Sequence, residues 1–196
     1  RDSEYPDGEY LLQIGVSSPT LSHSQRPVMN ITLVLDESGS MSGSPIQMLR
    51  ETCKAIAASL KEGDVVSMVT WDTSNAVRLE GHVVSGPNDS VLLEQINAIS
   101  PGGGTDLSGG LSAGYELAAA SYDSTRINRI VLVSDGGANA GITDIDLIAE
   151  HAGGQGQDGV YMVGVGVGSD TTYNDELMDQ VTDAGKGASV FIPDAD

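Results

Sequence analysis

The sequence predicts an α/β fold: a doubly wound, mostly parallel sheet with helices on both faces and one antiparallel edge strand. Three short apolar runs, at residues 30–35, 130–133 and 160–167, are bounded by polar loops, as is typical of strands buried in parallel sheets. Segments whose apolar residues recur every three or four positions separate these runs, which indicates amphipathic helices. Because strands and helices alternate along the chain, the helices are expected to cross over between parallel strands.

The N-terminal part of the chain contributes two further expectations. Alternating apolar residues predict an extra strand over residues 9–16, followed by a polar loop over residues 17–27. Ser44 and Pro45 are expected to open the first long helix, with the serine as its cap and the proline in its first position. Gly63 marks the end of this helical pattern.

A hairpin is predicted next, because only a few residues separate apolar segments 65–71 and 77–83. Strands joined this closely pair antiparallel, so the second one is expected at an edge of the sheet. The other expected elements are helices from residue 90 to 99, from 107 to 118, from 143 to 152 and from 173 to 183, and a last strand over 188–192.

Length and charge restrict the class of protein. A chain of 196 residues is expected to form one domain, here residues 1–196. It carries 28 acidic and 9 basic residues, a formal net charge of −19, which argues against binding to nucleic acid or to anionic lipid. The negative charge fits either simple solubility or affinity for cations and for basic or metal-bridged partners. No apolar run is long enough to cross a membrane, so no direct membrane insertion is expected.

The chain begins with Arg1 and no leader pattern follows, so we expect a piece of a longer protein. Cys53 is the only cysteine, which excludes an intrachain disulfide, and it lies on the apolar face of its helix, as a buried thiol would. A location at the cell surface, in the periplasm or outside the cell is favoured over the cytoplasm. The oligomeric state is left open.

Three polar loops carry the candidate chemistry. Residues 36–41 and 134–137 each directly follow an apolar strand, and residues 102–106 open a helix. In a doubly wound sheet all three are expected at the edge formed by the carboxyl ends of the strands, where ligands bind. From these loops, two carboxylates and three hydroxyls can form an all-oxygen set, which suits Mg²⁺ or Ca²⁺ and not zinc or copper. Such a site is a candidate docking point for a carboxylate from a partner.

These loops resemble the von Willebrand factor A domain family. The run DESGS at residues 36–40 fits the D-x-S-x-S motif of that family, GGGTD at 102–106 supplies its threonine, and SDGG at 134–137 supplies its second aspartate. The motifs occur in the family's order, and the resemblance extends over residues 9–192. It is nearest to the bacterial and inter-alpha-trypsin-inhibitor-heavy-chain-like branch. The fold it implies is the Rossmann-like von Willebrand A fold.

The resemblance implies a metal-ion-dependent adhesion site and no enzymatic activity. Its expected metal ligands are Asp36, Ser38, Ser40, Thr105 and Asp135. The rim that would meet a partner is expected, by proximity alone, at Glu37, Met41, Gly104 and Asn139. The implied cofactor is Mg²⁺, with Mn²⁺ or Ca²⁺ as alternatives, and the implied partner is a protein that offers an Asp or Glu to the metal.

Two other functions are weighed against this one. The first is a scaffold domain of a larger bacterial protein, in which a metal only stabilises the loops. The second is a metal-assisted phosphohydrolase, which would need a general acid two residues after Asp36, where this sequence has Ser38. The glycine-rich segment 102–104 is not followed by Gly-Lys-Ser/Thr, so it does not predict a phosphate-binding loop.

Overall fold

The computed structural model describes residues 22, 25–137, 146, 159–169 and 173–194. The strand expected over residues 9–16 therefore lies outside the described residues, as does nearly all of the helix expected over 143–152. Among the described helices, none is long and apolar enough to cross a membrane.

A six-stranded sheet forms the centre of the fold, in the order β3-β2-β1-β4-β5-β6. All neighbouring strands are parallel except β2 and β3, which pair antiparallel at one edge, as the hairpin prediction required. The doubly wound, mostly parallel fold is thereby confirmed. The strands are β1 Met29–Asp36, β2 Val65–Trp71, β3 Asn75–Val83, β4 Ile127–Ser134, β5 Tyr161–Gly168 and β6 Ala188–Pro193.

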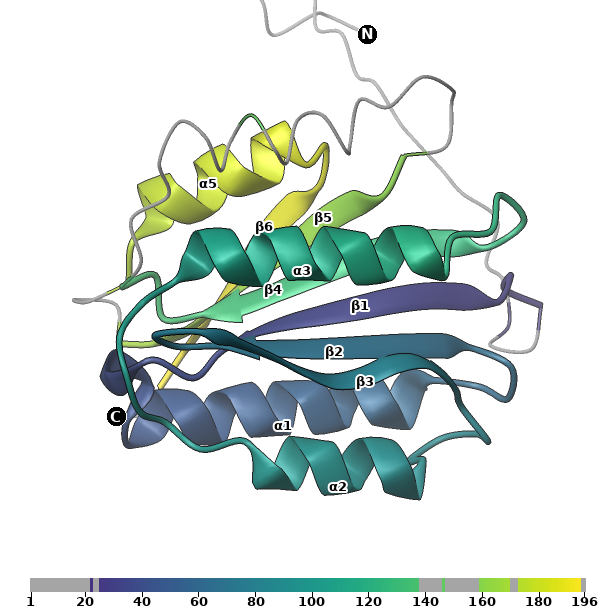
Figure 1. The fold of residues 1–196 in the computed structure, drawn as a ribbon, viewed down its shortest axis with the longest axis horizontal. Helices are drawn as coiled ribbons and strands as arrows, with labels where there is room; N and C mark the ends of the chain where they lie inside the picture. Colours follow the sequence, from purple (N-terminus) through teal and green to yellow (C-terminus); the bar gives the residue numbers. More distant parts are fainter. Residues whose placement is uncertain (1–21, 23–24, 138–145, 147–158, 170–172, 195–196) are drawn as a thin grey trace, which may run out of the picture.

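Helices cover both faces of this sheet (Figure 1). The helices α1 and α2 pack on one face, and α3 and α5 pack on the other. Their bounds are α1 Ser44–Ser59, α2 Ser90–Ala98, α3 Leu107–Ala120 and α5 Asp175–Ala184, and a short 3₁₀ helix, η1, spans Gly39–Met41. The prediction that Ser44 caps α1 is wrong by one residue: the cap is Gly43, with φ +91°, which leaves Ser44 and Pro45 in the first turn.

The alternation of side chains along β1 divides the core into two layers. Leu33 and Leu35 point to the side of α1 and α2, and Val34 points to the side of α3. Cys53 of α1 is completely buried, and burial raises the pKa of its thiol to about 12, so it packs as a small apolar residue. On the other side Trp71, at the end of β2, is completely buried beneath α3.

The contact between α3 and Trp71 depends on a glycine. A Cβ added to Gly110 would lie 2.5 Å from Cδ1 of Trp71, closer than carbon atoms approach. We therefore expect Gly110→Ala to lower the free energy of unfolding by about 1–3 kcal/mol, as overpacked substitutions do. Helix propensity alone predicts the opposite sign, a gain of about 1 kcal/mol. Urea denaturation measures the change.

Ser108→Ala is the matched control, because Ser108 is an exposed residue of the same helix. It is expected to change stability by less than about 0.5 kcal/mol. Equal stability of Gly110→Ala and wild type would show that α3 does not depend on this close approach.

The carboxylate of Asp89 caps the N-terminus of α2. It accepts bonds from the backbone N–H groups of Val91 and Leu92, both at 3.1 Å, from Ser85 and from Nε2 of His82 at 2.9 Å. Burial acts to raise the pKa of Asp89, but the bonds from Ser85, Leu92 and His82 outweigh it and hold the pKa well below its usual range.

This depressed pKa predicts an acid-dependent contribution to stability. Asp89→Ala is expected to lower the free energy of unfolding at pH 7 by about 1–2 kcal/mol, because the cap is lost. Since the pKa is lower in the folded protein, the contribution is present above the unfolded value of about 4 and is lost as the pH falls toward the folded value. Urea denaturation of both proteins from pH 7 to pH 2 should show the difference shrinking below pH 4.

The control is Asn174→Ala, which removes the neutral cap of α5, whose side chain accepts from Leu177 N at 3.1 Å. The decrease in the free energy of unfolding caused by Asn174→Ala should not depend on pH in this way. A difference between wild type and Asp89→Ala that stayed constant to pH 2 would contradict the role given to the Asp89 charge.

Candidate metal-binding site

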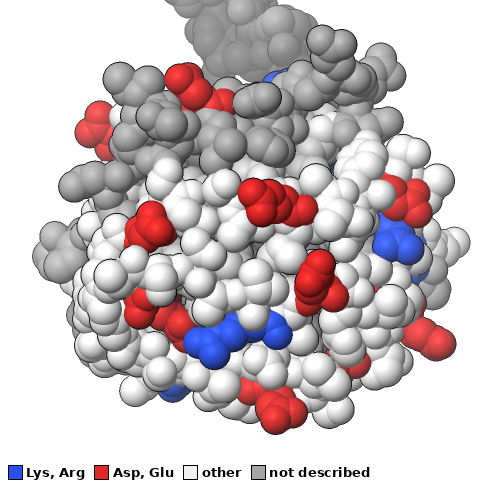
Figure 2. All heavy atoms as spheres, in the orientation of Figure 1, with Lys and Arg blue, Asp and Glu red and all other residues white. Residues whose placement is uncertain are grey.

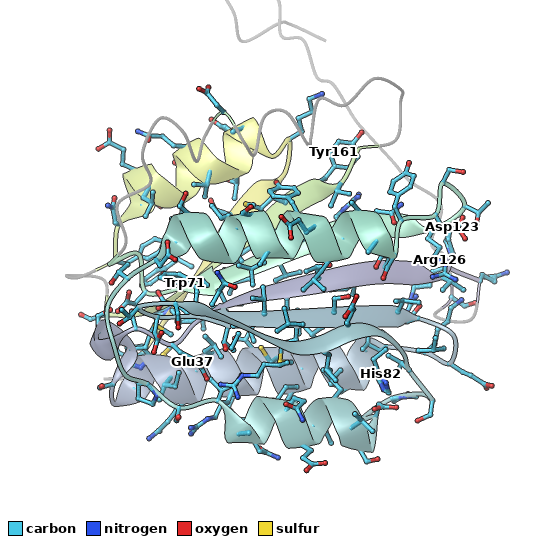
Figure 3. The ribbon with its side chains drawn as sticks, in the orientation of Figure 1. Glu37, Trp71, His82, Asp123, Arg126 and Tyr161 are labelled. Atoms are coloured by element: carbon cyan, nitrogen blue, oxygen red, sulfur yellow. The ribbon has the colours of Figure 1, made fainter. Side chains whose placement is uncertain are left out.

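The three polar loops lie at one edge of the sheet, where β1 and β4 end side by side (Figure 1). The chain continues from β1 to β2 on one side and from β4 to β5 on the other, so the strand order reverses between them. This topological switch point is where ligands bind in open α/β sheets. In Figure 3, Glu37 and Trp71 mark this end of the sheet, and Asp123 and Arg126 mark the opposite end.

Asp36 is the last residue of β1, and its side chain is completely buried. Its Oδ1 accepts from the backbone N–H of Ser38 at 2.8 Å, and its Oδ2 accepts from the hydroxyl of Ser134 at 2.6 Å. Burial raises the pKa of Asp36 above its usual value; the bonds from Ser134 and Ser38 oppose this rise, and the nearby charge of Asp135 adds to it. The carboxylate is thus fixed in orientation and only partly compensated in charge.

Ser38, Ser40 and Asp135 converge beside this carboxylate. The hydroxyls of Ser38 and Ser40 lie 3.0 Å apart, at the start of η1. Asp135 follows β4, and its Oδ1 accepts from the N–H of Gly137 at 2.8 Å. A Cβ added to Gly137 would lie 3.0 Å from that oxygen and 3.2 Å from Oγ of Ser40, so a larger residue at this position would crowd both oxygens.

The glycine-rich loop lies against the DESGS loop. The N–H of Gly39 donates to the carbonyl of Gly103 at 3.3 Å, and Gly103 has φ +72°, a conformation that favours glycine. Thr105, two residues later, is exposed. Asp106 accepts from Gly109 N at 3.0 Å as the cap of α3, so it serves the helix.

The four residues expected on the rim differ in their exposure and contacts. Met41 is completely buried in the core on the side of α1, so its expected place on the rim is wrong: the short η1 helix turns this side chain inward. Glu37 is 7% exposed, and both oxygens of its carboxylate accept from Arg78. Gly104 is exposed and its N–H donates to Thr73 at 2.6 Å. Asn139 lies outside the described residues.

Ser134 is a part of the site that the expected ligand set does not include. Its hydroxyl donates to Asp36 and accepts from the N–H of Gly136 at 3.0 Å, so it connects the loops after β1 and β4. The available signal was its position, at the end of an apolar run and directly before Asp135.

The residues present fit a hard divalent cation. Their oxygens come from two carboxylates and three hydroxyls, which suit a hard ion. The described residues contain no group of three or more His, Cys, Asp and Glu that could hold a metal ion, so such a site would depend on the hydroxyls as well. A cation beside Asp36 would compensate a carboxylate that is buried without a basic partner among the described residues. Hydroxyl ligands add no charge, so a divalent ion would keep affinity for one more anionic oxygen.

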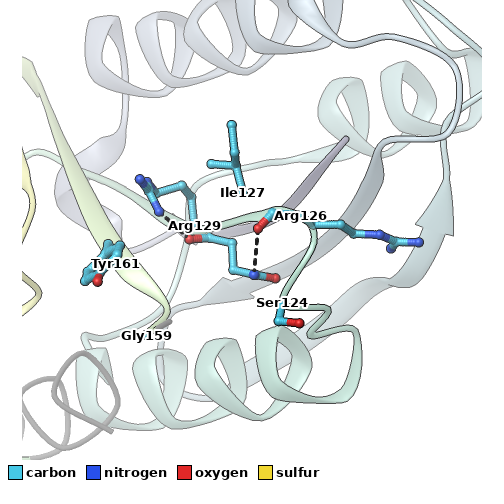
Figure 4. Close-up of a pocket in the computed structure, with 7 residues that line it drawn as sticks. Ser124, Arg126, Ile127, Arg129, Gly159 and Tyr161 are labelled. Carbon is cyan, nitrogen blue, oxygen red and sulfur yellow. Dashed lines mark hydrogen bonds between the residues drawn. The ribbon is translucent and has the colours of Figure 1, made fainter. Parts of the chain in front are cut away.

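A second feature, at the opposite end of the sheet, is separate from these loops. A pocket of about 180 Å³ lies where β4 and β5 begin, and Arg126, Arg129 and Tyr161 are among its lining residues (Figure 4). The guanidinium of Arg129 lies 4.9 Å from the centre of the Tyr161 ring. On the face shown in Figure 2, acidic side chains outnumber basic ones.

The fold is an open, mostly parallel α/β sheet with polar loops at its carboxyl edge. The chain matches the von Willebrand factor type A domain over residues 30–196, and it belongs to that family.

The relatives with matching sequences include bacterial and animal proteins. The chain is 28% identical to the uncharacterized protein YfbK of Escherichia coli, over 93% of this chain and 31% of that protein. It is 30% identical to inter-alpha-trypsin inhibitor heavy chain H2 of Sus scrofa, over 74% of this chain and 16% of that protein. The chain thus spans less than a third of the length of these two relatives.

Solved structures share the fold at low identity. A von Willebrand factor type A protein from Catenulispora acidiphila has a TM-score of 0.70 at 18% identity, over 87% of this chain and 39% of that one. Proximal thread matrix protein 1 of the mussel byssus, solved with zinc in its MIDAS motif, has a TM-score of 0.65 at 16% identity, over 86% of this chain and 44% of that one. Manganese-loaded TRAP protein of Plasmodium vivax has a TM-score of 0.63 at 13% identity, over 85% of this chain and 69% of that one.

Ser134→Ala tests the connection between the loops. We expect it to lower the free energy of unfolding by about 1–3 kcal/mol, because it removes a donor from buried Asp36 and the acceptor of Gly136 N. Ser189→Ala is the matched control: that serine also lies on a strand and donates to a carboxylate, Asp179 at 3.0 Å, but the bond is exposed. Urea denaturation that found equal losses for both variants would contradict a special role for Ser134.

Proposed function

We propose that the chain binds another protein through a divalent cation. The metal ligands are Asp36, Ser38, Ser40, Thr105 and Asp135, the metal is Mg²⁺ with Mn²⁺ or Ca²⁺ as alternatives, and the partner supplies a carboxylate.

One observation carries the proposal: loops from distant parts of the chain meet around the buried carboxylate of Asp36. The hydroxyls of Ser38 and Ser40 are 3.0 Å apart, and Gly137 lies against both Oγ of Ser40 and Oδ1 of Asp135. This placement supports a metal ion, because uncompensated carboxylates buried side by side are costly and a cation offsets the cost.

Each residue has a distinct task in this proposal. Asp36 is oriented by Ser134 and the Ser38 N–H and, together with Asp135, supplies the negative charge next to the ion. Ser38 and Ser40 supply neutral oxygens, and Thr105, which is exposed on the glycine-rich loop, supplies a third. The bound cation would act as a Lewis acid toward an incoming carboxylate, which favours a Glu or Asp side chain of the partner.

Binding is favoured over catalysis by the donor set. A phosphohydrolase would need a general acid near Asp36, and the position two residues later holds Ser38, whose hydroxyl is bonded to Ser40. A scaffold domain whose metal only stabilises the loops is the main alternative. It predicts higher stability in Mg²⁺ but no acidic side chain of a partner at the ion.

Calorimetric titration of chelator-treated protein with Mg²⁺, Mn²⁺ and Ca²⁺ tests the metal site. Wild type is expected to bind one ion per chain, and Asp36→Ala and Thr105→Ala are expected to abolish this binding. Asp123→Ala removes an acidic side chain at the opposite end of the sheet and serves as the control. Circular dichroism checks that each variant is folded. Binding equal to wild type in both Asp36→Ala and Thr105→Ala would overturn the ligand assignment.

The carboxylate requirement has its own test. An immobilised set of peptides, each with one Glu or Asp and paired with its Gln or Asn version, is probed with the protein in Mg²⁺ and in chelator. Retention of acidic peptides only in Mg²⁺, and only by wild type, supports the proposal. Metal-dependent stabilisation without any such preference would favour the scaffold alternative.

A further inference from the structure

Glu37 lies between two expected metal ligands but faces away from them. Asp36 points to the side of α3, where it meets Ser134, and the Glu37 side chain turns to the other side, where it meets the N–H of Ser100 just after α2. There both of its carboxylate oxygens accept from Nη2 of Arg78, at 3.2 and 3.0 Å. The Glu37 side chain is 9% exposed and that of Arg78 is 31% exposed, so water screens this ion pair only in part.

Arg78 reaches Glu37 from the edge strand of the sheet. It belongs to β3, and its Nε donates to the hydroxyl of Thr70 on β2 at 3.1 Å. The guanidinium therefore crosses β2 to arrive beside the end of β1. This route fixes the planar donor group and, through it, the position of the Glu37 carboxylate.

Glu37 also holds the segment that leads to Thr105. Its Oε1 accepts from the N–H of Ser100 at 3.0 Å, and its backbone carbonyl accepts from the N–H of Gly102 at 2.7 Å. Its own N–H donates to the carbonyl of Trp71 at 2.8 Å. Glu37 thus joins the DESGS loop to the end of β2, to the edge strand β3 and to the glycine-rich loop.

We infer that Glu37, held by Arg78, is a positioning residue. It sets the distance between the DESGS loop and the glycine-rich loop of the metal site. The inference rests on the proposed function, since it concerns the affinity of that site for metal. Glu37 does not meet the partner. It holds Ser38 and Thr105, which lie on separate loops, close enough to bind one ion.

Electrostatics and positioning predict opposite effects when Arg78 is replaced. Arg78 is a cation near the site, so its removal alone would strengthen the binding of a second cation. Loss of the clamp would instead leave the Glu37 carboxylate without its guanidinium and loosen its hold on Ser100 and Gly102. The sign of the change in metal affinity therefore separates the two effects.

The experiment is calorimetric titration of the chelator-treated chain with Mg²⁺. We expect Arg78→Gln to weaken Mg²⁺ binding on the order of 10-fold, as loss of groups that orient metal ligands does. Arg126→Gln is the matched control, because Arg126 is 29% exposed and pairs with Asp123 at the opposite end of the sheet. It should leave the Mg²⁺ affinity unchanged. Equal or tighter Mg²⁺ binding by Arg78→Gln overturns the inference.

Arg78→Lys gives the same test if Arg78→Gln does not fold. It keeps the charge but replaces the planar fork with a single ammonium group. Charge alone predicts no change in Mg²⁺ affinity, whereas positioning predicts weaker binding. Thermal unfolding in chelator confirms that each variant is folded at the temperature of the titration.

Hydrogen exchange in chelator tests the clamp without metal. The N–H groups of Ser100 and Gly102 should exchange faster in Arg78→Gln than in wild type, and should be unchanged in Arg126→Gln. Unchanged exchange overturns the inference even if the wild type binds Mg²⁺. If the wild type binds no divalent ion, the proposed function fails, and faster exchange of these groups would still show that Arg78 positions the loop.

Discussion

The parallel pairing of β1 with β4 is the constraint on which the site depends. These strands are far apart in the sequence, yet their register places Leu35 opposite Val133, so both strands end at the same edge. Asp36 and Ser134 then lie within hydrogen-bond distance, and the loops after them share one space. Because the chain leaves the two strands in opposite directions, this edge is a topological switch point, where ligands bind in open α/β sheets. The position of the site thus follows from the strand order.

Burial of the Asp36 carboxylate in a strongly acidic chain is electrostatically unfavourable at this edge of the sheet. A completely buried carboxylate with a second carboxylate nearby is offset here only by hydrogen bonds, from Ser38 and Ser134, among the described residues. A cation relieves this situation more fully than neutral donors can. The net charge of −19 adds a general attraction for cations, but it does not choose among them. That choice depends on the number and spacing of the oxygens.

The face to which each loop residue turns was less predictable than its place in the sequence. Glu37 and Met41 stand next to expected ligands, and proximity alone suggested that both would meet a partner. Instead η1 turns the Met41 side chain into the core. The Glu37 side chain bonds to Arg78 on the side of the sheet opposite to Asp36. Arg78 is 41 residues from Glu37. No local pattern connects the two, since only the pairing of β3 with β2 brings them together.

The sequence by itself determined the described strands and helices, their alternation and the position of the three polar loops, because apolar periodicity and turn residues act locally. It also determined that Cys53 is buried, through the spacing of the apolar face of α1. The tertiary structure decided which loop residues face the common space, how Ser134 fixes Asp36, and how Glu37 is clamped. These features arise from contacts between strands and loops far apart in the chain, whose geometry is set only when the sheet assembles.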